Sequence, residues 1–171
     1  MNLREALQEH YTKMQIKTMA QWVGNEPGRI SELLHILQHD EYRIAQRAAS
    51  VVSEVATAYP EQVQPYVPAL VAKLDDKQAH IAVKRNIYRI LQFLQLPEAV
   101  HGDLMNHCFD SLANPKEALA VRAFSMSILA RLVKDYPEIG NELKLIIDDV
   151  LQHEAAPSFK ARAKMVLKQI G

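Results

Sequence analysis

Apolar residues recur three and four positions apart along most of the chain, which is the spacing of helices that bury one face. The spacing is clear in Val67, Leu70, Val71 and Leu74, and again in Leu143, Ile146, Ile147, Val150 and Leu151. Polar or proline-containing breaks interrupt it at His39-Asp40, Asp75-Asp76, Asn114-Pro115 and Ala156-Pro157. The pattern therefore predicts pairs of helices joined by short turns.

Two marks repeat along the chain with a common period of roughly 40 residues. The first is a proline between an apolar or aromatic residue and a glutamate, in Tyr59-Pro60-Glu61, Leu96-Pro97-Glu98 and Tyr136-Pro137-Glu138. The second is an arginine ladder formed by Arg47, Arg85, Arg122 and Arg162. Because two independent marks share one period, we interpret the chain as an internal repeat.

Each repeat is expected to be one helical pair. The proline opens the first helix, where its missing N–H needs no helical partner, and the arginine lies in the second. The predicted pairs cover approximately residues 29–59, 61–95, 97–135 and 137–170. One pair cannot bury all of its apolar surface, but stacked pairs can. The predicted fold is therefore all-α, a single domain over residues 1–171 that forms a right-handed α-α superhelix with a concave and a convex surface.

The first 28 residues are predicted to form a helical cap over the first repeat, as one long helix or two short ones. Asn2 and Glu5 have the spacing of a capping box, and Gly24-Asn25 is a stop signal. The apolar residues of this segment are expected near one face: Leu3, Leu7, Tyr11, Met14 and Trp22.

Composition narrows the class of protein. The formal net charge is zero at neutral pH, so attraction to nucleic acid or membrane would have to come from local charge. The single cysteine, Cys108, excludes an internal disulfide and fits a reducing compartment. No apolar stretch approaches the length of a membrane span or a signal sequence. We expect a cytoplasmic protein without a membrane segment.

The stretch from Tyr59 through Asp75-Asp76 to Val83-Lys84-Arg85 resembles a HEAT repeat. That family pattern has a proline in the first helix, an aspartate at the turn, and a Val-Arg-like pair early in the second helix. The last unit departs from it, because no aspartate stands in the segment 155–158. The resemblance implies a HEAT-like solenoid. Such proteins are mostly protein-binding scaffolds, whereas some bacterial relatives act on alkylated DNA and others assist pigment attachment.

The resemblance also gives the arginine ladder an expected role. In HEAT-like repeats the equivalent basic residue ties a unit to its neighbour through acidic side chains or helix-end carbonyls. The alternative is a row of phosphate-binding groups, which we consider the weaker interpretation because a repeated position is best explained by repeated packing.

Charge is segregated between the two helices of a pair. Second helices are mainly basic and first helices mainly acidic. If second helices line the concave side, as the resemblance implies, they form a basic groove that attracts acidic peptides or phosphates. The candidate binding residues are Lys84, Arg85, Arg89, Arg122, Lys160 and Lys164. Alternatively, the charges only attract the two helices of each pair to one another.

The sequence contains little evidence for a metal site or for catalysis. His35 and His39 are four apart beside Asp40, but two histidines without a third ligand do not make a metal site. His107 and Cys108 are adjacent, so their side chains diverge on a helix, and the thiol is expected to be buried. The sequence contains no recognised catalytic motif. We therefore expect no enzyme, no metal and no cofactor.

Three functional hypotheses follow. The first is a scaffold that binds a protein or peptide along the basic surface. The second is a nucleic-acid binder related to alkylated-DNA glycosylases. Its aromatic residues would be Trp22, which is expected in the core, and Tyr88, which stands among basic positions. The third is self-pairing of the exposed end of the stack.

Overall fold

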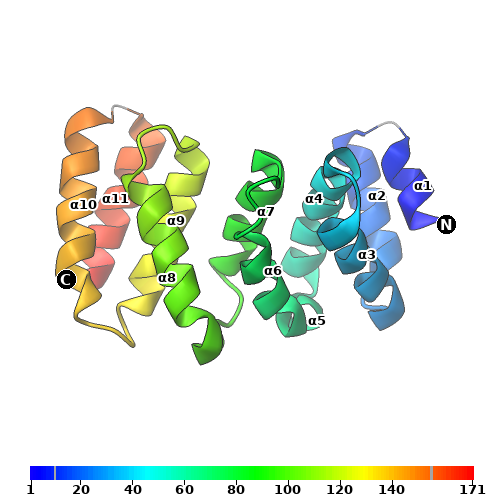
Figure 1. Ribbon diagram of the computed structural model, residues 1–171, viewed down its shortest axis with the longest axis horizontal. Coiled ribbons are helices and arrows are strands. Elements are labelled where there is room, and N and C mark those ends of the chain that lie inside the picture. The colour runs from blue at the N-terminus through cyan, green and yellow to red at the C-terminus, as the bar shows by residue number, and fades with distance from the viewer. Residues whose placement is uncertain (10, 155) are drawn as a thin grey trace. The chain divides into compact units, whose positions relative to one another are not determined.

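The computed structural model describes residues 1–9, 11–154 and 156–171, and the regular structure in these ranges is helical with no strand. The predicted all-α class is confirmed. The helices cluster into two compact units, Met1–Pro97 and Glu98–Gly171. Each unit is a stack of helical pairs (Figure 1).

Unit 1 contains two layers of helices. A first-helix layer consists of α1 (Leu3–Gln8), α3 (Pro27–His39), and the consecutive short helices α5 (Pro60–Val63), η1 (Gln64–Tyr66) and α6 (Val67–Lys73). A second-helix layer consists of α2 (Lys13–Val23), α4 (Tyr42–Ala58) and α7 (Ile81–Leu91). Contacts run from α2 to α4 to α7 within the second-helix layer, and from α1 to α3 to α5 within the first. The cap is thus a complete helical pair.

Unit 2 repeats this arrangement with two pairs. Its first helices are α8 (Glu98–Ala113) and α10 (Ile139–His153), and its second helices are α9 (Leu119–Leu132) and α11 (Pro157–Ile170). Helix α8 packs on α9 and α10 on α11, while α9 also contacts α11 and α8 contacts α10.

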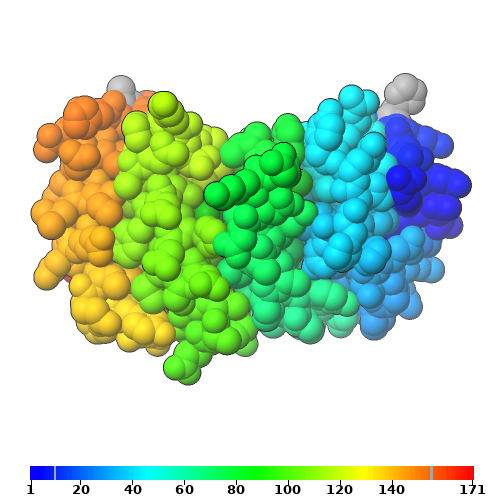
Figure 2. Space-filling view, in the orientation of Figure 1, coloured from blue at the N-terminus to red at the C-terminus, as the bar shows by residue number. Residues whose placement is uncertain are grey.

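The core of each unit lies between its layers and between successive pairs. In unit 1 it includes the fully buried Leu7, Leu33 and Leu37, and in unit 2 it includes Leu104 and Phe159. Burying one such side chain contributes about 1.5–3 kcal/mol. The space-filling view shows successive pairs of each unit in contact along their length (Figure 2). Stacking therefore buries the apolar stripes that one pair alone would expose.

The N-terminal cap differs from the predicted single face. It consists of two short helices, and the second begins with a capping box in which Thr12 and Gln15 bond each other's backbone N–H. The break changes the helical register, so Met14 is 77% exposed and Trp22 is half-buried rather than in the core. Asn2 caps α1 through the Glu5 N–H, as the sequence predicts.

Gly24 ends α2, and this predicted stop is confirmed. The residue has a φ of 52°, a left-handed conformation that glycine adopts without the steric penalty of a Cβ.

The first helix of the pair that ends with α7 is split into three parts, where the sequence pattern predicts one continuous helix. Pro65 lies inside η1, and Pro68 lies in the first turn of α6. Each proline lacks the N–H that would continue the α-helical bonding, so the chain passes through a short 3₁₀ turn between them.

Aspartates stabilise the turn between α3 and α4 and the turn between α6 and α7. Asp40 accepts two hydrogen bonds from Arg4, from Nε at 2.7 Å and Nη2 at 3.1 Å. These bonds lower the pKa of the Asp40 carboxyl below its ordinary value. The bond from Lys73 Nζ, at 2.9 Å, similarly lowers the pKa of Asp76. Lys73 also donates to a carbonyl of the preceding pair, so this turn fastens one pair to the next.

Candidate functional site

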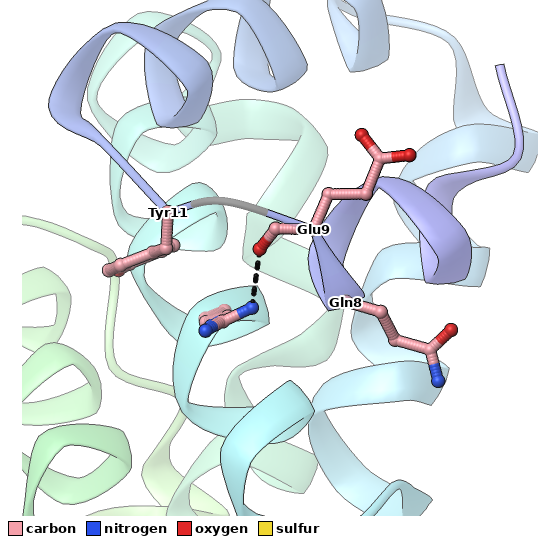
Figure 3. Close-up of a pocket in the computed structure, with 4 residues that line it drawn as sticks. Gln8, Glu9 and Tyr11 are labelled. Atoms are coloured by element: carbon pink, nitrogen blue, oxygen red, sulfur yellow. Dashed lines mark hydrogen bonds between the residues drawn. The ribbon is translucent and has the colours of Figure 1, made fainter.

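Arg47, on α4, joins the second-helix layer to the end of α1. Its Nη1 donates to the carbonyl oxygens of Leu7 and Glu9, each at 2.7 Å, and its guanidinium lies 5.3 Å from the Tyr11 ring centre. An open hollow of about 680 Å³ is lined by Gln8, Glu9, Tyr11 and Arg47. In Figure 3 the dashed line marks the bond from Arg47 to Glu9, and the Gln8 side chain points away from Tyr11. The Arg47 donors are thus directed at backbone carbonyls of the cap.

The two ladder arginines of unit 2 also contact neighbouring helices. Arg122 is only 7% exposed, and its Nε donates to the Leu112 carbonyl at 3.1 Å near the end of α8. Arg162 donates from Nη1 to the Ser127 hydroxyl of α9 at 2.8 Å. Because burial leaves the Arg122 guanidinium little surface for a partner, we omit Arg122 from the candidate binding residues.

Arg85 is the ladder position with a different environment. Its side chain is exposed, and among the described residues it makes no hydrogen bond or ion pair. Arg89 lies four positions later on the same exposed face of α7. The exposed Ile81 and Phe93 lie before and after the two arginines. We call this set, together with the half-buried Lys84, the α7 surface.

Charge on the α7 surface is uniformly positive, since α7 contains no acidic residue. The charge of Lys84 makes a small contribution to the lowered pKa of Asp76, whose main cause is the hydrogen bond from Lys73. Arg85 and Arg89 therefore provide most of the available positive charge. Tyr88 lies among these residues in sequence, but its side chain is buried.

One helix of the second-helix layer in unit 1 was not predicted from the sequence. Helix α2 belongs to this layer and carries Lys13 and Lys17, both exposed, without an acidic residue. The Thr12-to-Gln15 spacing was the signal that could have identified a separate second helix in the cap. Between α2 and α4, Lys17 and Glu54 line an open pocket of about 210 Å³.

In unit 2 the exposed basic residues lie on α11. Lys160 and Lys164, both predicted as binding residues, are exposed, and so is Lys168. Their spacing of four places them along one side of the helix. The paired helix α10 carries Glu142, Asp148 and Asp149. A groove that combines the α7 and α11 residues stays a prediction.

The remaining chemistry-bearing residues do not converge on a site. The rings of His35 and His39 lie 4.6 Å apart, but the described residues contain no group of three or more His, Cys, Asp or Glu side chains placed to hold a metal ion. Burial raises the pKa of the Cys108 thiol strongly, and the predicted burial of this residue is confirmed. His101 is also buried, with Nδ1 3.0 Å from the Tyr136 hydroxyl oxygen.

Neither of the two aromatic residues considered for base stacking, Tyr88 and Trp22, presents a free ring. Tyr88 is buried. The Trp22 ring is covered by the Arg29 guanidinium at 4.1 Å, and Arg29 also donates to the Trp22 carbonyl at 2.6 Å. No helix in the described ranges combines the length and the apolar character that crossing a membrane requires.

Comparison with known proteins supports the fold. Residues 3–170 match a family model described as a HEAT repeat domain. The chain matches no curated protein and no solved structure. The family match extends over the helices of both units, including the N-terminal pair.

Proposed function

Because this chain belongs to the HEAT repeat family, we propose that it is a non-enzymatic scaffold that binds an acidic protein segment on the α7 surface. The observation that carries the proposal is the environment of Arg85: the same ladder position is bonded to neighbouring elements at Arg47, Arg122 and Arg162, but is exposed in α7. An exposed arginine is available to a partner.

The chemistry of the α7 surface supports a partner of this kind. Arg85 and Arg89 are spaced to meet two carboxylates about one helical turn apart, and arginine can bind a carboxylate through two parallel N–H groups. The exposed Ile81 and Phe93 provide apolar contacts on either side of these charges. We infer a segment with central acidic residues and apolar residues at both ends. Desolvation of the apolar contacts would supply affinity, and the charges would orient the segment.

A displayed library of random peptides tests this proposal with the intact protein as bait. We expect selected peptides to share two or more acidic residues flanked by apolar ones. In the variant Arg85→Glu/Arg89→Glu, fluorescence anisotropy should show these peptides binding at least about tenfold more weakly, because both charge contacts become repulsive.

The matched control is Lys116→Glu/Lys134→Glu. It makes the same change in net charge at exposed positions outside α7, so peptide binding should be retained. Equal losses of peptide affinity in both variants would show that the effect depends only on net charge. Selected peptides without an acidic preference would remove the basis of the proposal.

Nucleic acid is the second candidate, since phosphates would also be attracted to Arg85 and Arg89. The buried Tyr88 and the covered Trp22 ring argue against base stacking as in single-strand binders. A mobility-shift titration with duplex and single-stranded DNA separates the two candidates. Phosphate contacts would give strong binding at low salt that falls steeply as salt rises, whereas we expect no shift that survives physiological salt.

We place this binding in the cytoplasm. The single cysteine of the chain supports this location, because it fits a reducing compartment.

A further inference from the structure

The exposed residues of the α7 surface stand in one row. Ile81, Arg85, Arg89 and Phe93 follow one another at intervals of four positions, and all four are exposed. The first three belong to α7, and Phe93 lies in the turn directly after it. Side chains four positions apart on a helix form a continuous ridge. A partner of this ridge has to present an apolar residue, two acidic residues and a second apolar residue along one line.

Two backbone conformations of the partner segment could present such a line. An extended segment, which rises about 3.3 Å per residue, would need its acidic residues two positions apart. A helical segment would need them four positions apart. The two conformations differ in what their backbones require. An extended backbone loses the water bonds of its N–H and C=O groups where it contacts a surface, and these groups then need new partners. A helix satisfies its backbone groups internally.

The α7 surface offers few acceptors to the N–H groups of an extended segment. Helix α7 contains no acidic residue, and its own carbonyl groups are used in helical bonding. Two amide side chains near the ridge are held against the helix itself. Asn86 donates from Nδ2 to the Ala82 carbonyl at 2.8 Å, and Gln92 donates from Nε2 to the Arg89 carbonyl at 3.0 Å. The surface is therefore rich in donors and poor in acceptors, which favours a partner that brings its acceptors on side chains.

We infer that the acidic segment binds the α7 surface as an amphipathic helix, with its apolar and acidic residues in one row at four-residue spacing. The two acidic residues meet Arg85 and Arg89, and the apolar residues four positions outside them lie toward Ile81 and Phe93. Rows of this spacing pack beside one another in the commonest class of helix pairs. The inference rests on the proposed function and adds the conformation and the register of the partner.

Two peptides of identical composition, each of about 16 residues, test the register, because helices of this length are only marginally stable alone. In the helical-register peptide the acidic residues are four positions apart, with a leucine four positions outside each. In the extended-register peptide all of these intervals are two positions. Fluorescence anisotropy with the intact protein should show the helical-register peptide binding at least about tenfold more tightly. Equal affinities, or tighter binding of the extended-register peptide, would overturn the inference.

A proline in the helical-register peptide tests the conformation. Placed between the two acidic residues, it interrupts the helical hydrogen bonding, so binding should weaken about tenfold or more. Alanine at the same position is the matched control and should bind like the parent peptide. The circular dichroism spectrum of the parent peptide mixed with the protein should also show more helix than the sum of the two separate spectra. Unchanged affinity with proline, or no gain of helix on mixing, would contradict a helical partner.

Charge reversal tests which arginine meets which acidic residue. Two further peptides each carry lysine in place of one of the two acidic residues. Arg85→Glu should restore the binding of one of these peptides, and Arg89→Glu should restore the binding of the other, because each substitution places opposite charges together again. Both arginines are exposed, so the variants should fold like the wild type, which circular dichroism verifies. Recovery in neither combination, or equal recovery of both peptides by one variant, would overturn the register.

The outcomes separate this inference from the proposed function. If no acidic peptide binds, or if Arg85→Glu/Arg89→Glu leaves the binding unchanged, the proposed function fails and the inference fails with it. If acidic peptides bind through Arg85 and Arg89 but prefer the extended register and tolerate proline, the proposed function stands and only the helical partner is wrong.

Discussion

Arg122 and Arg85 occupy the same register in neighbouring repeats, but only the Arg122 side chain is buried. Replacing Arg122 with alanine removes the bond to the Leu112 carbonyl and the packing against Phe159. We expect Arg122→Ala to lower the free energy of unfolding by about 1–3 kcal/mol, as for loss of a buried polar contact. Urea denaturation followed by circular dichroism measures this change.

The internal control is Arg85→Ala. Because Arg85 is exposed and makes no hydrogen bond or ion pair with the described residues, its removal should change the free energy of unfolding by less than about 0.5 kcal/mol. Equal destabilisation by both substitutions would contradict the distinction between a packed and an exposed ladder position.

The Arg4–Asp40 pair gives a pH-dependent prediction. The hydrogen bonds from Arg4 lower the pKa of Asp40 in the folded state. The pair therefore contributes stability above the ordinary carboxylate pKa, and this contribution is lost as pH falls through the lowered pKa. Arg4→Ala should be slightly less stable than the wild type at neutral pH, and the difference should disappear in acid.

Urea unfolding at several pH values measures this difference between the two proteins. Arg43→Ala is the control, since Arg43 is exposed and makes no hydrogen bond or ion pair within the described part of the chain. A stability difference for Arg4→Ala that persisted in strong acid would show that the pair acts through packing rather than charge.

The sequence identified the ladder positions but not their individual environments. Periodicity assigns Arg47, Arg85, Arg122 and Arg162 to the same place in each repeat. Whether a side chain finds a carbonyl depends on the neighbouring element, as Arg47 does at the end of α1. The distance between an arginine and such a carbonyl depends on the tertiary packing, so it could not be predicted from the spacing of the arginines in the sequence.

At the scale of single elements, the Thr12 cap provides a direct test of the N-terminal pair. The Thr12 hydroxyl accepts the Gln15 N–H, and the Gln15 side chain accepts the Thr12 N–H. Replacing Thr12 with alanine leaves the Gln15 backbone N–H without its side-chain acceptor. The expected loss in the free energy of unfolding is about 1 kcal/mol.

Thr18→Ala is the matched control in the same helix. The Thr18 hydroxyl bonds the Met14 carbonyl inside α2, which is already part of the helix. Alanine also has the higher helix propensity. Thr18→Ala should therefore be neutral or slightly stabilising, and a loss equal to that of Thr12→Ala would contradict the capping role.

Helix breaks explain where the sequence pattern was misleading. Leu3 and Leu7 are buried as predicted, but Met14 is exposed because α2 starts a new register after the break that follows α1. Apolar periodicity cannot be carried across a break, because the rotation between two helices is set by their packing. Pro65 and Pro68 were visible in the sequence, and their lack of N–H groups was sufficient to predict the split into α5, η1 and α6.

At the scale of the whole chain, the repeated proline and arginine marks predicted the stacking of helical pairs, which the family match supports. Local contacts dominate such a stack, so the period alone identifies it. The two compact units, and the exposed charge on α7 and α11, depend on which residues each pair buries against the next. Sequence spacing does not contain that information.

Nearest-neighbour packing predicts that damage to one pair stays local. Helix α1 contacts α3 and α4 in unit 1, and Leu7 is buried there. Leu7→Ala should weaken that packing by about 2–5 kcal/mol. Hydrogen exchange read by mass spectrometry should then accelerate in α1–α4, while α10 and α11 keep their wild-type protection.

The reciprocal variant is Ile147→Ala, because Ile147 is buried on α10 in unit 2. It should accelerate exchange in α8–α11 and leave α1–α4 unchanged. If either substitution raised exchange equally along the chain, the pairs would unfold as one cooperative body. The stability of this protein would then not be a sum of contributions from single pairs and from the contacts between adjacent pairs.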